Sequence, residues 1–336
     1  MMGVANALKR VILIASFVSG LSSLLKAQDA YFSQFFLNPV YLNPAYAGSM
    51  KVPRAGVQYR DQWPGFDNAY TTYFASFDTY LPAIKSGIGL LAYNDMQGNG
   101  IYTESSFKFI YSKEINLSSK WTMYGSITAG AQFNSINFSR LIFADELDPI
   151  NGQNQATGET FPENNNRLFP DFGAGILFFN GQYFFGLAGD HLTEPDQSIY
   201  SASPSQLPQK YTMHFEVNLP WFHTGHWRKY YKLNPNFIIQ SQGKERNLTY
   251  GIYANRKGIS LGIWNRLTSR KSADMILMAG FIGKQFKSAV TYDFNISGVG
   301  LQSHGAVEIS VSYLLKIPGK KSIFPFYEIP GEWDIR

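Results

Sequence analysis

The sequence predicts an all-β fold: a transmembrane, antiparallel outer-membrane β-barrel of about 14 strands, with an N-terminal extended segment and a C-terminal periplasmic tail. Three observations support this prediction. The chain begins with an export signal, most of it alternates apolar and polar residues with a period of two, and its expected connections alternate between short turns and longer loops. They divide the chain into residues 1–27, 28–53, 54–316 and 317–336.

Residues 1–27 have the layout of a secretory signal peptide, because Lys9 and Arg10 precede an apolar run and Ala27 offers a small residue for cleavage. The run is short and interrupted by serines, which disfavours a transmembrane helix. Cleavage would remove three of the 29 basic residues (Lys9, Arg10 and Lys26) and none of the 24 acidic ones, which leaves 26 basic residues. Such a nearly neutral chain does not indicate nucleic-acid binding. The chain has no cysteine, which excludes disulfides and thiolate chemistry.

Residues 28–53 are expected to form an extended segment punctuated by turns, on the periplasmic rim or in the lumen. A residue that precedes proline disfavours the helical conformation, and this happens at Asn38-Pro39 and at Asn43-Pro44. The segment is too apolar for a solvated linker and should pack against the barrel or against a partner protein. Its aromatic residues are Phe32, Phe35, Phe36, Tyr41 and Tyr46.

Residues 54–316 carry the period-two pattern of β-strands. Near the end, Val307, Ile309 and Val311 share one face while Glu308 and Ser310 share the other. Similar patterns occur near 211–219 and 286–296. Weaker ones occur near 54–62, 70–80, 86–95, 103–115, 120–137, 171–180, 182–191, 230–241, 246–256, 259–268 and 274–284. Strands of about ten residues suit a tilted crossing of a bilayer.

The expected connections give an orientation, because such barrels have short periplasmic turns and longer external loops. With both termini in the periplasm, the connections from even to odd strands should be short, and only 220–229 is not. The two long connections, 138–170 and 191–209, join odd to even strands and should lie outside. Aromatic residues near strand ends would form belts that contact membrane lipids and lipopolysaccharide: Trp63, Phe66, Tyr70, Trp121, Tyr183, Trp221, Trp227 and Tyr230.

The strand phases predict a polar but crowded lumen. The charged residues expected to point inward are Arg54, Arg60, Lys108, Glu216, Asp293 and Glu308. Large residues on or near lumen phases are Phe74, Phe77, Leu91, Tyr93, Tyr124, Phe179, Phe184, Tyr253 and Trp264. So much bulk favours a plugged or protein-filled interior over an open pore.

Residues 317–336 follow the last strand as a tail with three prolines, which disfavour both helix and strand. A disordered tail would contain few aromatic residues. This tail has four that could bind a periplasmic partner or fold back on the rim: Phe324, Phe326, Tyr327 and Trp333.

Several stretches resemble the PorP/SprF family of the Bacteroidota type IX secretion and gliding machinery. The most specific is the run N-P-x-Y-x-N-P-A-Y-A-G from Asn38 to Gly48, followed by R-x-Q-W-x-G-F from Arg60 to Phe66. Weaker matches lie at residues 87–90, 94–95 and 169–175, so the resemblance spans almost the whole barrel. The residues carried over as a partner-binding or signature set are Asn38, Pro39, Asn43, Pro44, Tyr46, Gly48, Arg60 and Trp63.

The resemblance implies an outer-membrane component that binds a dedicated partner and supports its export or surface anchoring. The implied partners are a large secreted adhesin with a type IX C-terminal sorting domain and periplasmic ring lipoproteins of the same system. A general porin or small-solute channel, which needs only a polar lumen, is the main alternative. A soluble β-sandwich that binds a partner is the third.

No residue pattern indicates catalysis, a metal site or a cofactor. His223 and His226 have metal-like spacing but no third ligand nearby, and Asp145, Glu146 and Asp148 lack the glycine of an EF-hand loop. The motifs of serine hydrolases, phosphate-binding loops and zinc proteases do not occur. We therefore expect a protein that is not an enzyme.

Overall fold

A computed structural model of the chain describes residues 29–66, 69–148, 152–153, 156–161, 165–199, 204–220, 231–256, 258–269, 272–283, 285–296 and 304–315. The chain divides into two compact units, Met1–Ala30 and Tyr31–Arg336. The predicted signal peptide and the predicted tail, with Phe324, Phe326, Tyr327 and Trp333, lie outside the described residues. In the described part, no helix is long and apolar enough to cross a membrane.

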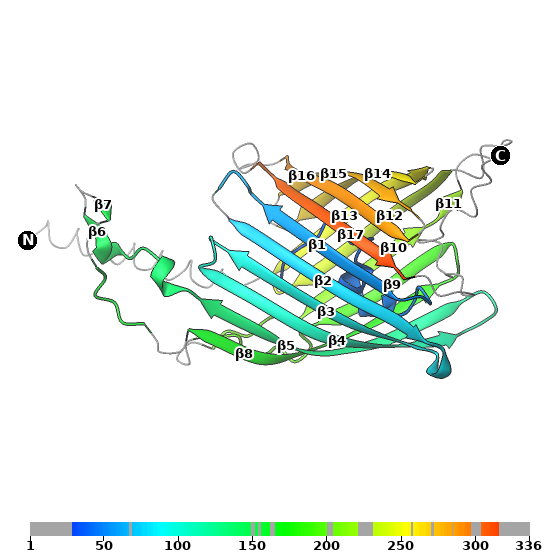
Figure 1. Cartoon of the computed structure of the whole chain (residues 1–336), viewed down its shortest axis with the longest axis horizontal. Coiled ribbons are helices and arrows are strands. Elements are labelled where there is room, and N and C mark those ends of the chain that lie inside the picture. The colour runs from blue at the N-terminus through cyan, green and yellow to red at the C-terminus, as the bar shows by residue number, and fades with distance from the viewer. Residues whose placement is uncertain are drawn as a thin grey trace, which may run out of the picture. The chain divides into compact units, whose positions relative to one another are not determined.

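The second unit contains a closed antiparallel barrel, which confirms the predicted fold (Figure 1). Its wall consists of fourteen strands, as the alternation predicted: β1 (Arg54–Gln62), β2 (Tyr70–Leu81), β3 (Ser86–Gln97), β4 (Tyr102–Asn116), β5 (Thr122–Ile136), β8 (Asn166–Phe179), β9 (Tyr183–Asp190), β10 (Lys210–Val217), β12 (Tyr231–Gln242), β13 (Glu245–Arg256), β14 (Ile259–Thr268), β15 (Ala273–Ile282), β16 (Phe286–Asn295) and β17 (Ala306–Leu314). Pairing of β1 with β17 and of β10 with β12 completes the ring.

The remaining elements lie in the connections. Strand β11 (Leu219–Pro220) continues β10 and pairs with β12, whereas β6 (Leu147–Asp148) and β7 (Gly152–Gln153) pair with each other. The 3-10 helices in these connections are η3 (Pro82–Ile84), η4 (Phe138–Arg140) and η5 (Ala144–Glu146), whereas α2 (Pro39–Leu42) and η2 (Pro44–Tyr46) precede β1. None of these elements changes the order of the wall strands.

The two ends of the barrel differ in their connections. The end that carries 137–165 and 191–209, together with β6 and β7, is here termed the loop end. The opposite end, termed the turn end, carries 82–85, 117–121, 180–182, 257–258 and 283–285. The connection 218–230 is the longer exception at the turn end, as predicted. The asymmetry is incomplete, since 243–244 and 98–101 are also short at the loop end.

The wall is polar inside and apolar outside. In β17, Glu308, Ser310 and Ser312 are buried, whereas Ile309 and Tyr313 are 45% and 43% exposed. A soluble protein would bury the apolar set, so this arrangement suits a barrel whose outer surface meets lipid. All six charged residues predicted to point inward are buried, which confirms the strand phases: Arg54, Arg60, Lys108, Glu216, Asp293 and Glu308.

One of the large residues assigned to the lumen was placed wrongly. Phe77 is 39% exposed on the outer face, whereas Phe74 is buried. Positions 74 and 77 of one strand have opposite parity, and successive side chains of a strand point to opposite faces, so both could not point inward. The eight other residues of that set are buried in the lumen.

Exposed aromatic side chains lie at strand ends, as expected for interfacial belts. Trp63, Phe66, Trp121 and Tyr183 are each between 37% and 43% exposed. Three other members of the predicted belts, Trp221, Trp227 and Tyr230, lie outside the described residues, as do His223 and His226.

The outer surface predicts a position-dependent cost for arginine. Ile127 lies in the middle of β5 and is 64% exposed, whereas Ile84 lies in a turn-end connection and is 48% exposed. Ile127→Arg should destabilise the barrel by about 2–4 kcal/mol, because the charge would lie at the bilayer midplane. Ile84→Arg should have little effect. Equilibrium unfolding in liposomes measures both, and equal effects would mean that β5 does not face lipid.

Candidate functional site

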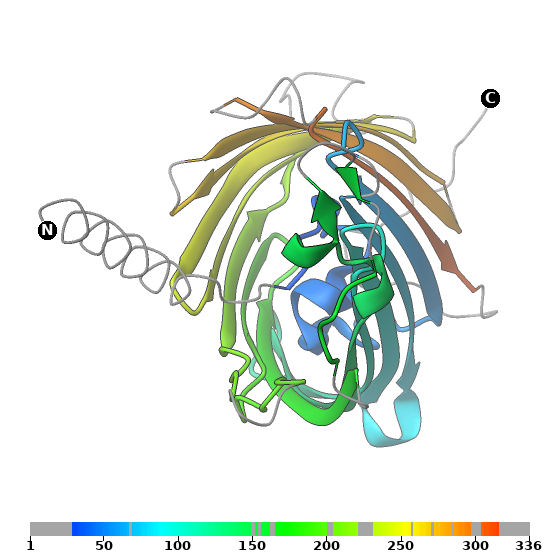
Figure 2. The same ribbon diagram turned by 90° about the vertical axis from the view of Figure 1, so that its left-hand side faces the viewer.

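Residues 31–53 lie inside the barrel, and we call them the lumen segment. All residues from 33 to 52 are buried except Tyr41, which is half-buried. Figure 2, a view on to the loop end, shows the helical turns of this segment within the ring of strands. The lumen segment is therefore the main candidate functional element of the chain.

The lumen segment contains the predicted turns, but two short helices interrupt the extended backbone that was expected. Pro39 begins the one-turn helix α2 (Pro39–Leu42), and Pro44 begins the 3-10 helix η2 (Pro44–Tyr46). Proline is favourable at the first position of a helix, because its missing N–H would have no helical partner there. Asn43 is in the β conformation before Pro44, as expected, and its side chain accepts a hydrogen bond from the amide of Ala45 at 2.9 Å.

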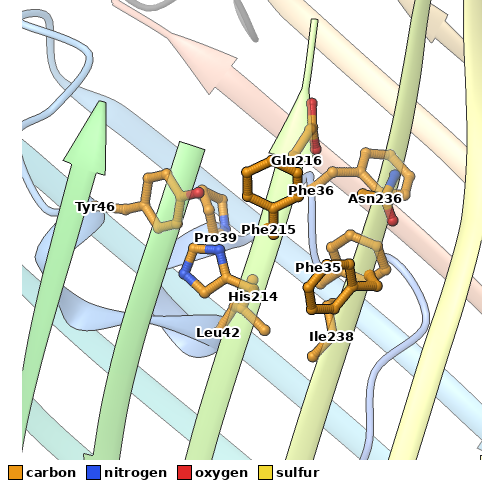
Figure 3. A pocket seen from close by; sticks show the side chains of 11 residues that line it. Phe35, Phe36, Pro39, Leu42, Tyr46, His214, Phe215, Glu216, Asn236 and Ile238 are labelled. Carbon is orange, nitrogen blue, oxygen red and sulfur yellow. The ribbon is translucent and has the colours of Figure 1, made fainter. Parts of the chain in front are cut away.

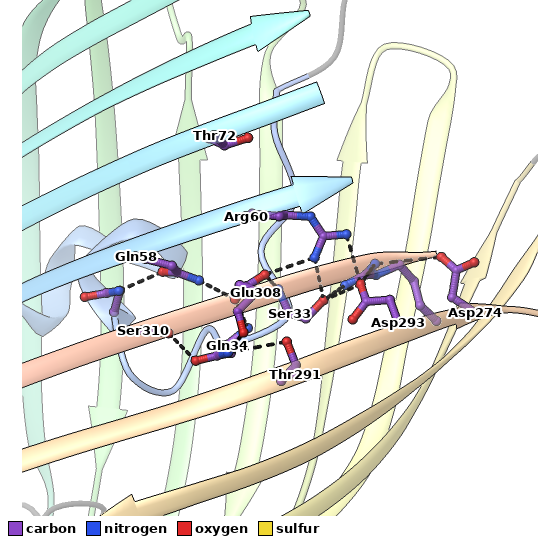
Figure 4. A network of polar contacts seen from close by, with 12 residues as sticks. Ser33, Gln34, Gln58, Arg60, Thr72, Asp274, Thr291, Asp293, Glu308 and Ser310 are labelled. Atoms are coloured by element: carbon purple, nitrogen blue, oxygen red, sulfur yellow. Dashed lines mark hydrogen bonds and ion pairs between the residues drawn. The ribbon is translucent and has the colours of Figure 1, made fainter. Parts of the chain in front are cut away.

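The first buried residue of the segment lies in a network of charges. The hydroxyl of Ser33 donates to Asp293 at 2.6 Å and accepts from Arg60 at 3.1 Å and from Arg266 at 2.7 Å (Figure 4). Arg60 also forms ion pairs with Asp293 at 2.9 Å and with Glu308 at 3.0 Å. Two guanidinium groups and one carboxylate thus contact one hydroxyl, and a second carboxylate pairs with one of the guanidinium groups. Burial of such charges is favourable only when all of them are paired and hydrogen-bonded.

Glu308 also binds the backbone of the segment. Its carboxylate accepts hydrogen bonds from the amides of Ser33 at 2.8 Å and Gln34 at 2.7 Å. The side-chain amide of Gln34 donates to the carbonyl of Glu308 at 2.7 Å, and its oxygen accepts from the hydroxyl of Ser310. The wall therefore recognises both the backbone and the side chains of these two residues.

Asn38 and Asn43 bind two different parts of the barrel wall. Asn38 donates to Gln58 of β1 at 2.7 Å. Asn43 donates to the carbonyl oxygens of Ile176 at 3.0 Å and Leu187 at 3.2 Å, which belong to the paired strands β8 and β9. Nδ2 of Asn43 also lies 3.2 Å from Nε2 of His214 in β10.

Glycines of the wall provide the space for these contacts. A Cβ atom at Gly56 would overlap the side chain of Asn38, and one at Gly175 would overlap that of Asn43. One at Gly87 would overlap the carbonyl oxygen of Ala47. A larger residue at any of these positions would push the lumen segment away from the wall.

The last part of the segment is fixed near the turn end. Gly48 has a φ of +70°, which favours glycine, and its amide donates to Asp78 at 2.8 Å. Asp78 is also paired with Arg54 at 2.7 Å. Lys51 forms an ion pair with Glu114 and lies 3.5 Å above the ring of Tyr80.

Aromatic packing fills the remaining space. The ring of Phe36 stacks on Trp264 at 5.8 Å and on Tyr253 at 5.5 Å between centroids, and Tyr46 stacks on His214 at 5.5 Å. A cavity of about 20 Å³ remains among the residues shown in Figure 3. Its volume is enough for about one water molecule. Its lining includes Phe35, Phe36, Leu42, Tyr46, His214 and Ile238.

The structure brings together seven of the eight residues of the predicted signature set. Asn38, Pro39, Asn43, Pro44, Tyr46, Gly48 and Arg60 are all buried in the lumen. Trp63 is apart from them, 37% exposed after the end of β1, with a φ of +64° and its ring 5.3 Å from that of Tyr70.

Sequence reasoning did not assign Ser33, Gln34, Arg266 or His214 to the site. Arg266 has the same parity in β14 as Trp264, which had been placed in the lumen, so the strand phase could have identified it. The same parity argument places His214 with Glu216 in β10. Ser33 and Gln34 lie in no period-two pattern, and no local signal distinguishes them from their neighbours.

The sequence matches the family model described as "Type IX secretion system membrane protein PorP/SprF" over residues 24–313. The chain belongs to the PorP/SprF family. The resemblance found in the sequence is therefore confirmed. Together with its closed barrel and apolar outer surface, membership identifies this PorP/SprF chain as an outer-membrane component of the type IX secretion system.

Several solved structures are similar to this PorP/SprF chain in fold alone. They include the outer membrane protein Omp33 of Acinetobacter baumannii, with a TM-score of 0.45, 6% identity and coverage of 80% of this chain and 100% of that chain. The CymD monoaromatic hydrocarbon channel has a TM-score of 0.42 and 9% identity, with coverage of 87% of this chain and 95% of that chain. The KdgM porin in complex with disordered oligogalacturonate has a TM-score of 0.37 and 7% identity, with coverage of 78% of this chain and 99% of that chain. A comparison with curated proteins finds no match.

The contacts of Asn43 predict that Asn43→Asp destabilises the barrel although it preserves the shape of the side chain. Aspartate can still accept from Ala45 but cannot donate to the carbonyls of Ile176 and Leu187. Loss of satisfied partners in a buried site costs about 1–3 kcal/mol. The measurement is the free energy of unfolding in detergent or liposomes.

Asn137→Asp is the matched control, because the exposed Asn137 side chain accepts from Ser139 and aspartate can do the same. This control should retain wild-type stability. Equal stabilities of the two variants would contradict the role of Asn43 as a donor to the wall.

Proposed function

We propose that this barrel binds a dedicated exported partner and supports its export or surface anchoring, by binding rather than by catalysis. The partner class is a large adhesin-like protein with a type IX C-terminal sorting domain. Family membership supports the link to secretion. The observation that carries the proposal is the filled lumen, because a barrel occupied by its own chain offers its ends, rather than its interior, to other molecules.

The filled lumen weighs against the porin alternative. A porin needs a continuous water-filled path through the barrel. Here the lumen segment is bonded to the wall near the loop end by Ser33 and Gln34 and near the turn end by Gly48 and Lys51. The cavity beside Phe36 and Tyr46, at about 20 Å³, is far smaller than such a path.

The connection at the loop end offers a surface for the partner. We call residues 137–161, of which 137–148, 152–153 and 156–161 are described, the outer arm. In this arm, the ring of Phe161 packs against the rings of Phe138 and Phe143, with centroid distances of 5.0 Å and 5.1 Å. Ile142 and Leu147 are 60% and 54% exposed. Exposed apolar side chains that cluster on one element are typical of protein interaction sites.

The outer arm is held in shape by a carboxylate. Asp145 accepts a hydrogen bond from the amide of Gly158 at 2.7 Å and another from the hydroxyl of Thr157 at 2.9 Å. These bonds, that of Gly158 above all, lower the pKa of Asp145 below its usual value. The carboxylate thus links two parts of the arm that lie more than ten residues apart in the sequence.

The second proposed contact is periplasmic. The tail, residues 317–336, would bind a ring lipoprotein of the same system through its aromatic residues. Deletion of the tail should leave the barrel assembled and abolish co-purification with that lipoprotein, and unchanged co-purification would refute this part of the proposal.

The partner proposal predicts that Ile142→Arg combined with Leu147→Arg impairs surface retention of the cognate adhesin. The two arginines would place charge on the apolar surface of the outer arm, whereas the barrel wall is unchanged. Surface adhesin is measured by immunolabelling of intact cells, with heat-modifiable migration as the check on barrel assembly. Ile84→Arg, an equally drastic change at the turn end, is the control, and retention unchanged in the arm variant would exclude the outer arm as the docking surface.

The partner-binding proposal and the porin alternative predict different conductances of the barrel in a planar bilayer. We expect the wild-type barrel to show no steady conductance. Ser33→Ala combined with Gln34→Ala removes the bonds of the Ser33 hydroxyl to buried charged groups, each of which typically contributes about 1.5–3 kcal/mol, and the bonds of the Gln34 side chain to neutral groups of the wall. The double variant should produce intermittent openings as the segment loosens. Ser105→Ala, which alters a contact with Asn94 on the wall, should remain closed. A steady conductance in the wild type would favour a channel.

A further inference from the structure

The direction of the lumen segment is fixed by its contacts. Ser33 and Gln34 touch residues close to the loop end: Arg60 near the end of β1, Asp293 near the end of β16 and Glu308 near the start of β17. These parts of the three strands adjoin the connections 63–69 and 296–305, which lie at the loop end. The first buried residues of the segment therefore lie in the loop-end half of the lumen.

The other end of the segment lies at the turn end. Gly48 donates to Asp78, near the end of β2, and Lys51 pairs with Glu114, near the end of β4. The carbonyl of Pro53 accepts from the amide of Leu315, directly after the last strand. From Ser33 to Pro53, the chain thus passes along the lumen from the loop end to the turn end before it enters β1.

The residues before Ser33 could reach the turn end only by passing through the lumen a second time, and the lumen segment itself blocks that path. Ala45, Ala47 and Met50 are fully buried between the walls, and Ser112 of β4 donates to the carbonyl of Ala45 at 3.2 Å. The amides of Ser33 and Gln34 are both bonded to Glu308, which fixes the backbone at the entry. The segment is buried against the wall along this path, and the cavity beside Phe36 and His214 has a volume of only about 20 Å³.

We infer that the chain is threaded through its own barrel from the loop-end mouth, so that the start of the processed chain emerges on the same face as the outer arm. Because long loops of such barrels face the exterior, this face is the cell surface. The two ends of the processed chain then lie on opposite sides of the outer membrane. Under the proposed function, the N-terminal stretch becomes part of the face that meets the exported partner.

Single cysteines can test this topology, because the natural chain contains none. One cysteine is placed in a short epitope inserted between Gln28 and Asp29, and cells are treated with a membrane-impermeant maleimide carrying polyethylene glycol. Ile142→Cys in the outer arm marks the loop end, and Leu117→Cys, 53% exposed in a turn-end connection, marks the other. Gel shifts are compared before and after permeabilisation of the outer membrane.

The inserted cysteine and Ile142→Cys should be modified to the same extent on intact cells, and Leu117→Cys only after permeabilisation. If the inserted cysteine behaves as Leu117→Cys does, threading is refuted while the proposed partner binding still stands. If Leu117→Cys is modified on intact cells and Ile142→Cys is not, the orientation is reversed, and both the surface N-terminus and the external docking arm are refuted.

A second variant guards against disturbance by the insertion. Ala30→Cys keeps the native chain length and lies before the first contact with Glu308. In a barrel that still shows heat-modifiable migration, it should be modified from outside after mild urea treatment of intact cells that leaves Leu117→Cys protected. Modification that requires permeabilisation would refute threading.

Discussion

The fold depends on one constraint: charges that point into a narrow lumen must find partners there. Fourteen strands enclose a lumen that is filled by inward side chains and by the lumen segment, so these charges have little contact with bulk water. Arg60, Arg266, Asp293 and Glu308 would then face each other with unfilled hydrogen-bonding capacity. The backbone amides and the hydroxyl at residues 33–34 fill part of that capacity, which is favourable because a buried unpaired charge costs several kcal/mol. The lumen segment is thus part of the barrel's electrostatics as well as its packing.

The same constraint determines what the barrel can do. Several charges of the lumen bind the chain's own segment, Asp78, Asp293 and Glu308 among them, and others such as Lys108 and Asp171 pair within the wall, which leaves fewer of them for a solute. Recognition must then occur at the two ends, where side chains are exposed and the connections differ. The loop end carries the outer arm with exposed Ile142 and Leu147, and the turn end carries mostly short connections. This difference suits a protein that meets separate partners on the two sides of one membrane.

The sequence predicts the wall far better than its contents. Period-two alternation identifies every wall strand because the lipid outside and the polar lumen inside impose opposite demands on neighbouring residues. Phe77 was misplaced because it was assigned to the lumen together with Phe74, which points to the opposite face of the same strand. The lumen segment has no such periodicity. The rule that disfavours helix before proline was correct at Asn38 and Asn43, yet it says nothing of the residues that follow, and Pro39 and Pro44 begin helical turns there.

The contacts also explain why the specific part of the family signature lies in the lumen segment. Asn43 can donate to Ile176 and Leu187 only because Gly175 and Gly186 leave room for it and for His214. Asn38 requires Gly56 in the same way. These motif residues therefore act in a fit between segment and wall, which any member with this interior would need whatever its partner. Under the proposed function, information that distinguishes one exported partner from another would then lie outside this fit, in elements such as the outer arm.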